Sequence, residues 1–296
     1  MYYSENTQVF LNGSFIKAKN AQTTLFGQSL HYGSGVFEGI RSYETENGTR
    51  IFKAEEHYER LLFSAKKSHI KLDYDVEELV RITNQLLSLN KMSNAYIRPL
   101  VYLGQNMALS PTSEVNLFIC AWNWGRYLGE GGLRVVTSPY ERPNPKSCHV
   151  EAKVSGHYTN SILATTDAKA KGYDEALLLD QNGFIAEGPG ANIFFEKDGK
   201  LYTPQRGNIL PGITRETIID IARDLGITIE EGQYSLEDLK NADGAFFTGT
   251  AAEVASITSL DDKNFNKEWE DTIGYELSNA YNLAVLGQYN QAHTVI

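Results

Sequence analysis

The pattern of apolar and polar positions in the first half of the chain predicts short strands around two helices. Apolar residues at spacings of three and four predict helices over 54–69 and 75–90. A hairpin is predicted over 9–16, because its centre, Asn12-Gly13, is a dipeptide typical of two-residue hairpin turns. The other predicted strands are 35–43 and 50–53, which Asn47-Gly48 joins, and 95–103 and 115–124.

A glycine-rich stretch separates this half from the next. Residues 125–132 contain four glycines and show no apolar periodicity, so they are predicted to link a domain of residues 1–124 to a domain of residues 133–296. The second domain mixes strands, tight turns and helices, which favours an α+β fold over a doubly wound parallel sheet. Its predicted strands are 133–137, 175–180, 183–187, 191–196, 200–203, 227–231 and 245–248, and its predicted helices are 160–171, 214–225, 235–241 and 268–286.

The composition narrows the class of protein. Of the 296 residues, 42% are hydrophobic and 22% are charged, as in an ordinary globular protein. The net charge of -10 argues against nucleic acid as a partner, because phosphate backbones need a basic face. The apolar runs are too short to cross a membrane, and the first residues do not resemble a secretion signal. With only Cys120 and Cys148, the chain is expected in the reducing cytoplasm, without a disulfide framework or a metal cluster.

Two segments have the form of anion-binding turns. In 210–216, a Pro-Gly turn runs directly into an amphipathic helix and leaves the amides of Ile213 and Thr214 at the positive end of the helix dipole. In 246–253, an apolar strand breaks at a glycine before Thr250, and the small residues there let backbone amides approach an anion closely. Each segment alone is also compatible with a capped turn that has no ligand. Their presence in one chain favours an anionic ligand.

Lys153 and Glu187 are candidates for reactive groups. Lys153 lies among small and apolar residues without acidic neighbours at helical spacing, so it could act as a Schiff-base nucleophile or a general base. Glu187 ends an apolar strand before a Gly-Pro-Gly turn, where it could meet a protonated ring nitrogen. The local sequence is equally compatible with a surface lysine whose charged end reaches water, and with a turn carboxylate bound by nearby amides.

The first half offers further charged and aromatic side chains. Tyr96 and Arg98 project from the same face of a predicted strand and could bind a carboxylate together. An arginine on an edge strand, paired with a neighbouring carboxylate, is the alternative. Arg60 follows Glu56 by four residues in a predicted helix, and we interpret it locally as a surface residue paired with that glutamate.

Five motifs, distinctive in combination, occur in the order and spacing of a known family. They are HYGSGVFEGIR (31–41), YIRPLVYLG (96–104), AEGPGANIFF (186–195), LPGITRE (210–216) and TGTAAEV (248–254). Over residues 9–259 the chain resembles the fold-type IV pyridoxal-phosphate enzymes, and most closely the branched-chain amino acid aminotransferases. The resemblance implies a small N-terminal α+β domain and a larger C-terminal domain with a barrel-like mixed sheet.

The resemblance implies pyridoxal 5'-phosphate as the cofactor and gives roles to the matching residues. Lys153 matches the catalytic lysine that holds the cofactor as a Schiff base and shuttles a proton. Glu187 matches the carboxylate that pairs with the pyridine nitrogen, and Tyr158 matches the tyrosine that bonds the ring hydroxyl. The residues that match the phosphate-binding positions are Arg60, Ile213, Thr214 and Thr250. The resemblance therefore replaces the surface interpretations of Lys153 and Arg60.

The substrate-binding residues are implied in the same way. Tyr96 matches a residue at the α-carboxylate of the substrate, where Thr250 and Ala251 also contribute, and Arg98 matches one that receives the distal carboxylate of glutamate. The apolar side-chain pocket is matched by Phe37, Trp124 and Tyr127, with Tyr32 and Leu109 contributed by the partner subunit of a homodimer or a larger dimer-based oligomer.

The implied reaction is the reversible transfer of the amino group between L-leucine, L-isoleucine or L-valine and 2-oxoglutarate, in branched-chain amino acid biosynthesis. Other activities on the same fold stay open as alternatives: D-amino acid aminotransferase, (R)-selective amine transaminase and aminodeoxychorismate lyase. A protein of a different class, a non-enzymatic binder of small anions, is disfavoured by the complete set of Lys153, Glu187, Tyr158 and Arg60.

Overall fold

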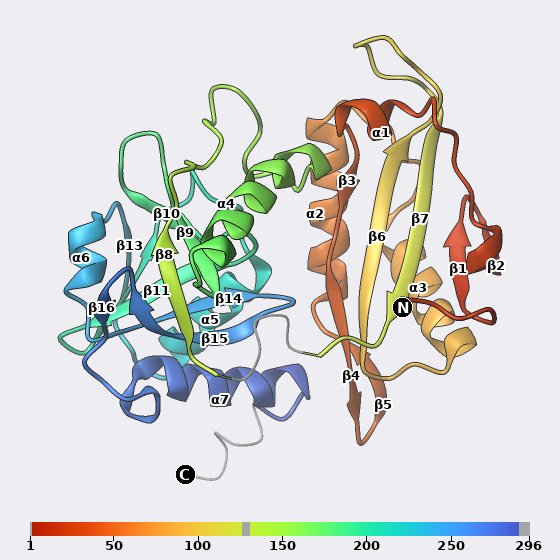
Figure 1. The fold of residues 1–296 in the computed structure, drawn as a ribbon. Helices are drawn as coiled ribbons and strands as arrows, with labels where there is room; N and C mark the ends of the chain where they lie inside the picture. Colours follow the sequence, from red (N-terminus) through yellow and green to blue (C-terminus); the bar gives the residue numbers. More distant parts are fainter. Residues whose placement is uncertain (1, 126–130, 290–296) are drawn as a thin grey trace. The chain divides into compact units, whose positions relative to one another are not determined.

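The computed structural model describes residues 2–125 and 131–289, which divide into two compact units (Figure 1). The first unit comprises the described residues up to Gly125 together with Ala152–His157, and the second comprises the others. Main-chain hydrogen bonds tie the short segment to the first unit: Ser155 and Gly156 donate to the carbonyl oxygens of Gly35 and Gly33 at 2.8 and 2.9 Å. The predicted boundary assigns residues 133–296 to one domain. It therefore groups Ala152–His157 with the second unit, whereas in the structure this segment belongs to the first.

The first unit is an antiparallel sheet with helices against one of its faces (Figure 1). The strand order is β2-β1-β7-β6-β4-β5, and β3 pairs with β6. Its helices are α1 (Gln28–Tyr32), α2 (Ala54–Lys67) and α3 (Val76–Asn90), and its strands are β1 (Gln8–Leu11), β2 (Ser14–Lys17), β3 (Val36–Phe37), β4 (Ile40–Thr45), β5 (Gly48–Ile51), β6 (Ala95–Leu103) and β7 (Val115–Trp122). The hairpin at Asn12-Gly13 is confirmed, and so is the second hairpin, although its turn residues are Glu46 and Asn47 because Gly48 already pairs with Thr45.

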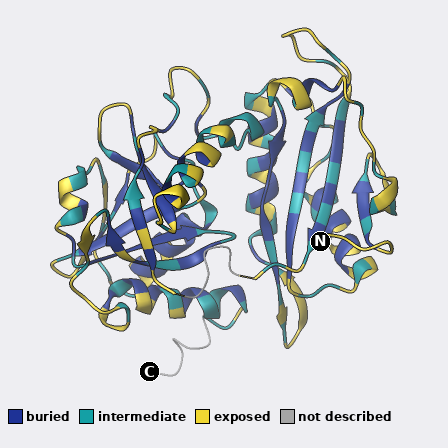
Figure 2. Cartoon of the chain, in the orientation of Figure 1, coloured by how far each residue is buried: buried dark blue, intermediate teal, exposed yellow. Residues whose placement is uncertain are grey.

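Alternation along β6 separates the two faces of this sheet. Ile97 and Val101 are buried in one cluster with Leu61 of α2 and Leu86 of α3. Arg98, on the opposite face, lines a groove. Successive side chains of a strand point to opposite faces, so the same strand supplies both the core and the functional surface. In Figure 2, buried positions follow the strands and exposed positions follow the outer surfaces of the helices.

The second unit is built on a mixed sheet that closes on itself. The order is β10-β9-β8-β15-β14-β11, and β10 also pairs with β11, which completes the ring. β8 is parallel to β9 and β15, and the other pairs in the ring are antiparallel. The strands are β8 (Leu133–Thr137), β9 (Glu175–Leu179), β10 (Ile185–Glu187), β11 (Asn192–Lys197), β12 (Lys200–Pro204), β13 (Ile229–Gly232), β14 (Gly244–Gly249), β15 (Glu253–Leu260) and β16 (Lys263–Asn264), and the helices are α4 (Tyr158–Ala170), α5 (Ile213–Asp224), α6 (Leu236–Lys240) and α7 (Ile273–Val285).

Every strand of the ring contributes to one buried apolar cluster. Its members include Leu133, Leu177, Ile185, Ile193, Phe247 and Ile257, one from each strand. The closed mixed sheet confirms the barrel-like sheet that the resemblance implies, and with it the α+β class.

The hydrophobic pattern does not predict β15, although this strand pairs with both β14 and β8. Its sequence, EVASITSL, places serines and a threonine among the apolar residues, so the apolar alternation is weak. The short helix α1 is also missing from the sequence-based prediction. The last helix begins at Ile273 instead of 268, after a separate 3-10 turn at Trp269–Asp271.

Candidate active site

Main-chain contacts hold Lys153 against the first unit. Its N–H donates to Ser64 Oγ on α2 at 2.9 Å, and its carbonyl accepts a hydrogen bond from the Phe37 N–H at 3.1 Å. Ser64 is fully buried. The Lys153 ammonium lies 5.0 Å from the centre of the Phe37 ring. These contacts anchor the backbone of Lys153 to helix α2 and strand β3.

Phe37, Tyr96 and Arg98 form a cluster beside this lysine. The Arg98 guanidinium lies 4.7 Å from the centre of the Phe37 ring, and its Nη2 donates to Tyr96 Oη at 3.1 Å. The Trp124 ring meets the Tyr96 ring edge to face, with 4.7 Å between their centres. Among the described residues, the buried Nε of Arg98 has no hydrogen-bond partner. Arg98 is only partly buried, but a guanidinium whose buried Nε has no partner fits a carboxylate ligand, because buried polar groups are normally paired.

A glycine makes room for the Tyr96 hydroxyl. A Cβ atom at Gly39 would lie only 2.0 Å from Tyr96 Oη. Any side chain at position 39 would therefore collide with Tyr96. This steric constraint explains the glycine of the VFEGIR segment without an unusual backbone conformation.

Arg60 binds Glu38 and not Glu56. Its Nε and Nη2 donate to Oε1 and Oε2 of Glu38 at 2.6 and 2.9 Å, and its side chain is only 10% exposed. Glu56 pairs instead with Lys53 at 2.7 Å. The local interpretation of Arg60 as a surface residue is therefore wrong. Helical spacing reveals partners on the same helix only, whereas Glu38 lies between β3 and β4.

His57 completes a buried charged cluster with Glu38 and Arg60. Its Nδ1 lies 2.8 Å from Glu38 Oε2, and both side chains are almost completely buried. Burial alone raises the pKa of Glu38, but the Arg60 guanidinium and the His57 ring outweigh it and hold that pKa well below its usual range. Burial lowers the pKa of His57, against the opposing effect of Glu38. Glu38 is therefore a carboxylate, which can only accept, so His57 donates to it from Nδ1.

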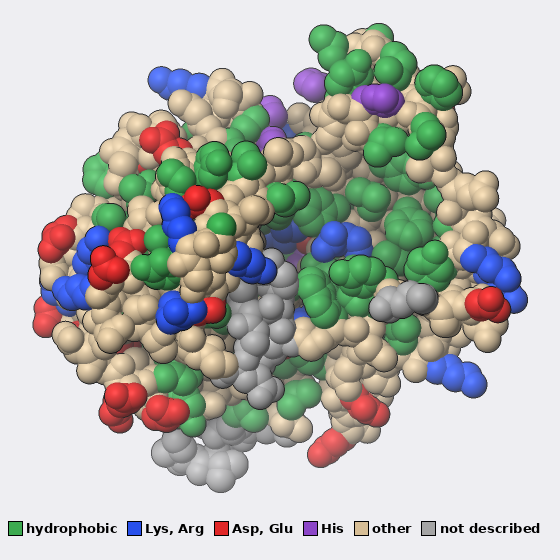
Figure 3. Space-filling view, in the orientation of Figure 1, with side chains coloured by type: hydrophobic (Ala, Val, Ile, Leu, Met, Phe, Trp, Pro, Cys, Tyr) green, Lys and Arg blue, Asp and Glu red, His purple; other side chains and the backbone are tan. Residues whose placement is uncertain are grey.

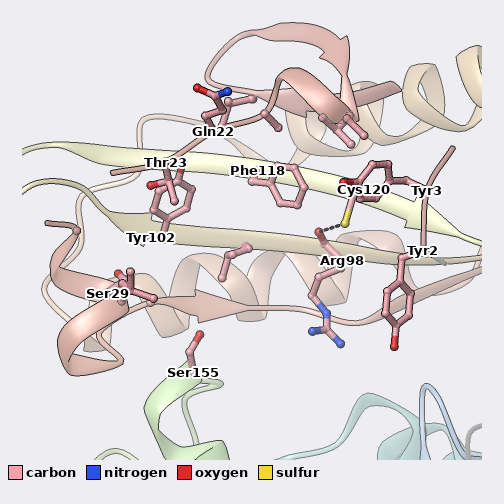
Figure 4. Close-up of a pocket in the computed structure, with 18 of the residues that line it drawn as sticks. Tyr2, Tyr3, Gln22, Thr23, Ser29, Arg98, Tyr102, Phe118, Cys120 and Ser155 are labelled. Carbon is pink, nitrogen blue, oxygen red and sulfur yellow. Dashed lines mark hydrogen bonds between the residues drawn. The ribbon is translucent and has the colours of Figure 1, made fainter. Parts of the chain in front are cut away.

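A groove of about 800 Å³ runs along the face of β6 and β7 that is opposite the helices (Figure 4). Phe118, Cys120 and Trp122 of β7 line it together with Arg98 and Tyr102 of β6. Most of these side chains are apolar or aromatic, and Arg98 brings a positive charge to one part of the groove. Such a lining accepts hydrocarbon and also an anionic end.

Exposed apolar side chains gather at the α1 end of the first unit (Figure 3). α1 and the β6–β7 connection form this surface together, since Gln28 Nε2 donates to the carbonyl oxygens of Ala108 and Ser110 at 2.7 and 2.8 Å. Tyr32 and Leu109, the residues expected to reach a partner subunit, are 47% and 86% exposed here. We call this surface the α1 patch; its members are Leu25, Phe26, Leu30, Tyr32, Met107 and Leu109.

In the second unit, an ion pair with Arg142 and hydrogen bonds from Asn192 and Leu210 hold the carboxylate of Glu187. Arg142 Nε lies 2.8 Å from Oε1, and Asn192 Nδ2 donates to Oε2 at 2.9 Å. The Leu210 N–H reaches both oxygens at 3.2 Å. Both side chains of this ion pair are more than 90% buried, so the two opposite charges meet away from solvent.

Ile213 and Thr214 open α5 close to this carboxylate. The N-cap residue is Gly212, which has no side chain to cap the helix, and a Cβ atom there would lie 1.9 Å from Asn192 Oδ1. The first amides of a helix have no partner within the helix, and the helix dipole adds to their attraction for anions. The fully buried Arg215 anchors the first turn of α5, because its Nη2 donates to Pro204 O at 2.9 Å.

Thr250 and Ala251 lie in the connection between β14 and β15. Gly249 pairs with Glu253 at the end of this hairpin, so the connection is a tight turn of small residues. Tyr158 is the first residue of α4. Both positions belong to the second unit, with Glu187 and the start of α5.

The expected site residues are thus divided between the units. The first unit brings together Lys153, Arg60 and the cluster around Arg98, and it carries the α1 patch. The second unit carries Glu187, Tyr158 and the two anion-binding turns. Tyr127 lies outside the described residues.

Sequence reasoning missed Glu38, His57 and Arg142. A signal existed for Glu38, since a carboxylate between Phe37 and Gly39 in an apolar strand region needs a buried partner. Nothing local distinguishes Arg142, which lies in a loop rich in proline and polar residues. Within 2–125 and 131–289 there is no group of three His, Cys, Asp or Glu side chains placed to hold a metal, and no helix is long and apolar enough to span a membrane.

Comparison with known proteins identifies the family. The profile of amino-transferase class IV matches residues 35–260. The branched-chain-amino-acid aminotransferase of Pseudomonas aeruginosa is 38% identical over 291 residues, 96% of this chain and 94% of that protein. The crystal structure of the branched-chain aminotransferase of Thermoproteus uzoniensis with norvaline shares 37% identity over 96% of both chains, with a TM-score of 0.93. That of the Thermobaculum terrenum branched-chain amino acid aminotransferase in its PLP form shares 32% identity over 97% of this chain and 98% of that one, with a TM-score of 0.90. The chain therefore belongs to the class IV aminotransferases, in the family of the branched-chain amino acid aminotransferases.

Proposed function

We propose that this chain transfers the amino group reversibly between L-leucine, L-isoleucine or L-valine and 2-oxoglutarate, with pyridoxal 5'-phosphate as its cofactor. The observation that carries the proposal is the environment of Arg98. Its guanidinium has an unused buried donor and lies among Phe37, Tyr96 and Trp122. This combination suits both kinds of substrate: the aromatic surroundings accept a branched aliphatic side chain, and the guanidinium accepts the distal carboxylate of glutamate.

The donor groups of the two units fit the chemistry of the cofactor. Its phosphate needs positive charge and amides, which Arg60, Ile213, Thr214 and Thr250 would supply. Its pyridine nitrogen needs an ionised carboxylate, and the contacts of Glu187 support that role. When bound, the cofactor ring withdraws electrons from the substrate carbon that loses its proton. Tyr158 would hold the ring hydroxyl.

Lys153 would carry the proton during the transfer. Its backbone is fixed by Ser64 and Phe37, and its ammonium lies 5.0 Å from the centre of the Phe37 ring. A lysine held beside the reacting carbon can pass a proton as a general acid or base. Thr250 and Ala251 would offer amides to the α-carboxylate, and Tyr96 would add its hydroxyl.

We also propose that the enzyme is a homodimer in which the α1 patch meets a second copy of the chain. Contiguous exposed apolar surfaces of this kind mark interaction sites in soluble proteins. Tyr32 and Leu109 would then reach the substrate pocket of the partner. We expect this enzyme in the cytoplasm, where the free thiols of Cys120 and Cys148 stay reduced.

Absorption spectra test the proposed reaction. Purified protein is expected to be yellow from bound cofactor, and L-leucine should remove the yellow absorption until 2-oxoglutarate restores it. If the purified protein does not bind pyridoxal phosphate, the proposed transaminase activity is ruled out. A response to D-alanine or to an (R)-amine, without a response to L-leucine, would favour the corresponding sibling activity.

A further inference from the structure

We propose that Glu38 is a positioning residue that holds the Arg60 guanidinium in the orientation in which it binds the cofactor phosphate. The inference rests on the proposed function, because it takes Arg60 as a phosphate ligand. The proposed reaction does not itself use Glu38 or its partner His57. The inference gives this buried pair a role.

The contacts of Glu38 involve both oxygens of its carboxylate. Oε1 accepts from Arg60 Nε, and Oε2 accepts from Arg60 Nη2, His57 Nδ1 and the Gly39 N–H, at distances of 2.6 to 3.2 Å. The side chain is completely buried. Four donors surround a carboxylate that has about four lone-pair sites, one of these donors at Oε1 and three at Oε2. Glu38 therefore binds its protein neighbours, and its buried carboxylate is not accessible to a substrate.

The geometry fixes the plane of the guanidinium. Two parallel hydrogen bonds from Nε and Nη2 leave the group one orientation, whereas a single bond would let it rotate. Glu38 uses the Nε–Nη2 edge only, so its grip does not involve Nη1. The Glu38 backbone is itself anchored, since its N–H donates to Pro99 O on β6 at 2.9 Å.

The same helix also fixes Lys153. His57, Arg60 and Ser64 follow one another on α2 at spacings of three and four, which places them on one helix face. His57 and Arg60 contact Glu38, and Ser64 contacts the Lys153 backbone. Glu38 therefore connects the expected phosphate ligand to the frame that holds the reactive lysine.

A role limited to neutralising Arg60 predicts the opposite change in phosphate affinity when the charge of Glu38 is removed. If Glu38 only neutralised a buried arginine, removing its charge would leave Arg60 more attractive to a phosphate dianion. If Glu38 positions Arg60, removing its charge weakens phosphate binding although the net positive charge of the cluster increases.

Binding of pyridoxal phosphate and of pyridoxal to the apoprotein tests the proposal, because only the first ligand carries the phosphate. For Glu38→Gln we expect about a tenfold or larger loss of affinity for pyridoxal phosphate and little change for pyridoxal. Glu56→Gln is the matched control, since Glu56 lies on the same helix but pairs with Lys53 at the surface. The control should change neither affinity.

A second variant covers the case in which Glu38→Gln does not fold. Glu38→Asp keeps the charge but shortens the side chain by one methylene, so positioning predicts the same selective loss and neutralisation predicts none. An unchanged or increased preference for pyridoxal phosphate over pyridoxal in either variant would overturn the positioning role. Wild-type protein that binds neither ligand would overturn the proposed function itself.

Discussion

The position of Lys153 depends on its backbone more than on its side chain. Ser64 and Phe37 hold the main chain on both sides of the residue. Replacement of the side chain should therefore leave the fold intact while it removes the amine.

For Lys153→Ala we expect unchanged thermal unfolding and a loss of transaminase activity of at least about 10²- to 10⁴-fold, the range over which a positioned proton-transfer group contributes. Steady-state rates with L-leucine and 2-oxoglutarate measure the loss. Lys171→Ala is the control, because Lys171 is half exposed and pairs with Asp167. Substantial activity in Lys153→Ala would mean that another lysine carries the proton.

Glu38 also makes the stability of the first unit depend on pH. Its pKa in the folded chain lies below its ordinary value, so Glu38 stabilises the fold above the ordinary value, and this contribution declines as the pH falls toward the lower, folded-state pKa. Glu38→Gln should therefore destabilise the protein strongly near neutral pH and less near pH 3. Urea unfolding at both values measures the difference. An equal loss at both would show that the charge of Glu38 does not contribute.

The surroundings of Arg60 show why the sequence indicated Arg60 as a candidate site residue but not its partners Glu38 and His57. Motif matching selected Arg60 for the phosphate, but local spacing paired it with Glu56. The actual partner, Glu38, lies 22 residues earlier in the sequence and meets Arg60 only after β3 and α2 pack together. Contacts between distant segments leave no periodic pattern, so Glu38 and His57 emerge from the structure.

At the scale of elements, turn chemistry made the hairpins predictable and weak alternation concealed β15. Asn12 and Gly13 both adopt positive φ angles, of 47° and 88°, as the favoured hairpin turn requires. β15 has no comparable signal, yet it lies between β14 and β8 and completes the ring. The barrel-like sheet was therefore predictable from the family resemblance and not from periodicity.

The start of α5 depends on Gly212. Its φ of -72° is accessible to any residue, so the constraint is steric: an added Cβ would collide with Asn192, which binds both Glu187 and the Leu210 carbonyl. For Gly212→Ala we expect a destabilisation of about 1–3 kcal/mol from overpacking, together with weaker binding of pyridoxal phosphate. Urea unfolding and cofactor titration measure the two effects.

Gly131→Ala provides the comparison for this variant. A Cβ atom at Gly131 would have open space around it, so its stability and cofactor affinity should match those of the wild type. If Gly212→Ala behaved like this control, the collision with Asn192 would be relieved without cost, and the proposed constraint on the helix start would be wrong.

At the scale of the whole molecule, the residues that the family resemblance assigns to the active site belong to distant parts of the chain. Lys153 and Arg98 belong to one unit, and Glu187 and the start of α5 belong to the other. Tyr32 and Leu109 lie in the α1 patch, where both are strongly exposed to solvent. Their expected role in a substrate pocket needs a second copy of the chain, so oligomeric state and activity should change together.

Leu109→Asp tests this dependence. Burying a leucine side chain contributes roughly 1.5–3 kcal/mol, and a symmetric dimer would bury Leu109 twice, so the dissociation constant should rise by at least about 10²-fold. Sedimentation over a range of concentrations should show dimers for the wild type and monomers for the variant, with activity falling at the concentrations where monomers form. Leu89→Asp is the control, because Leu89 is 48% exposed on α3, outside the α1 patch. A variant that stays dimeric would place the interface elsewhere, and a fully active monomer would exclude the partner's Tyr32 and Leu109 from the substrate pocket.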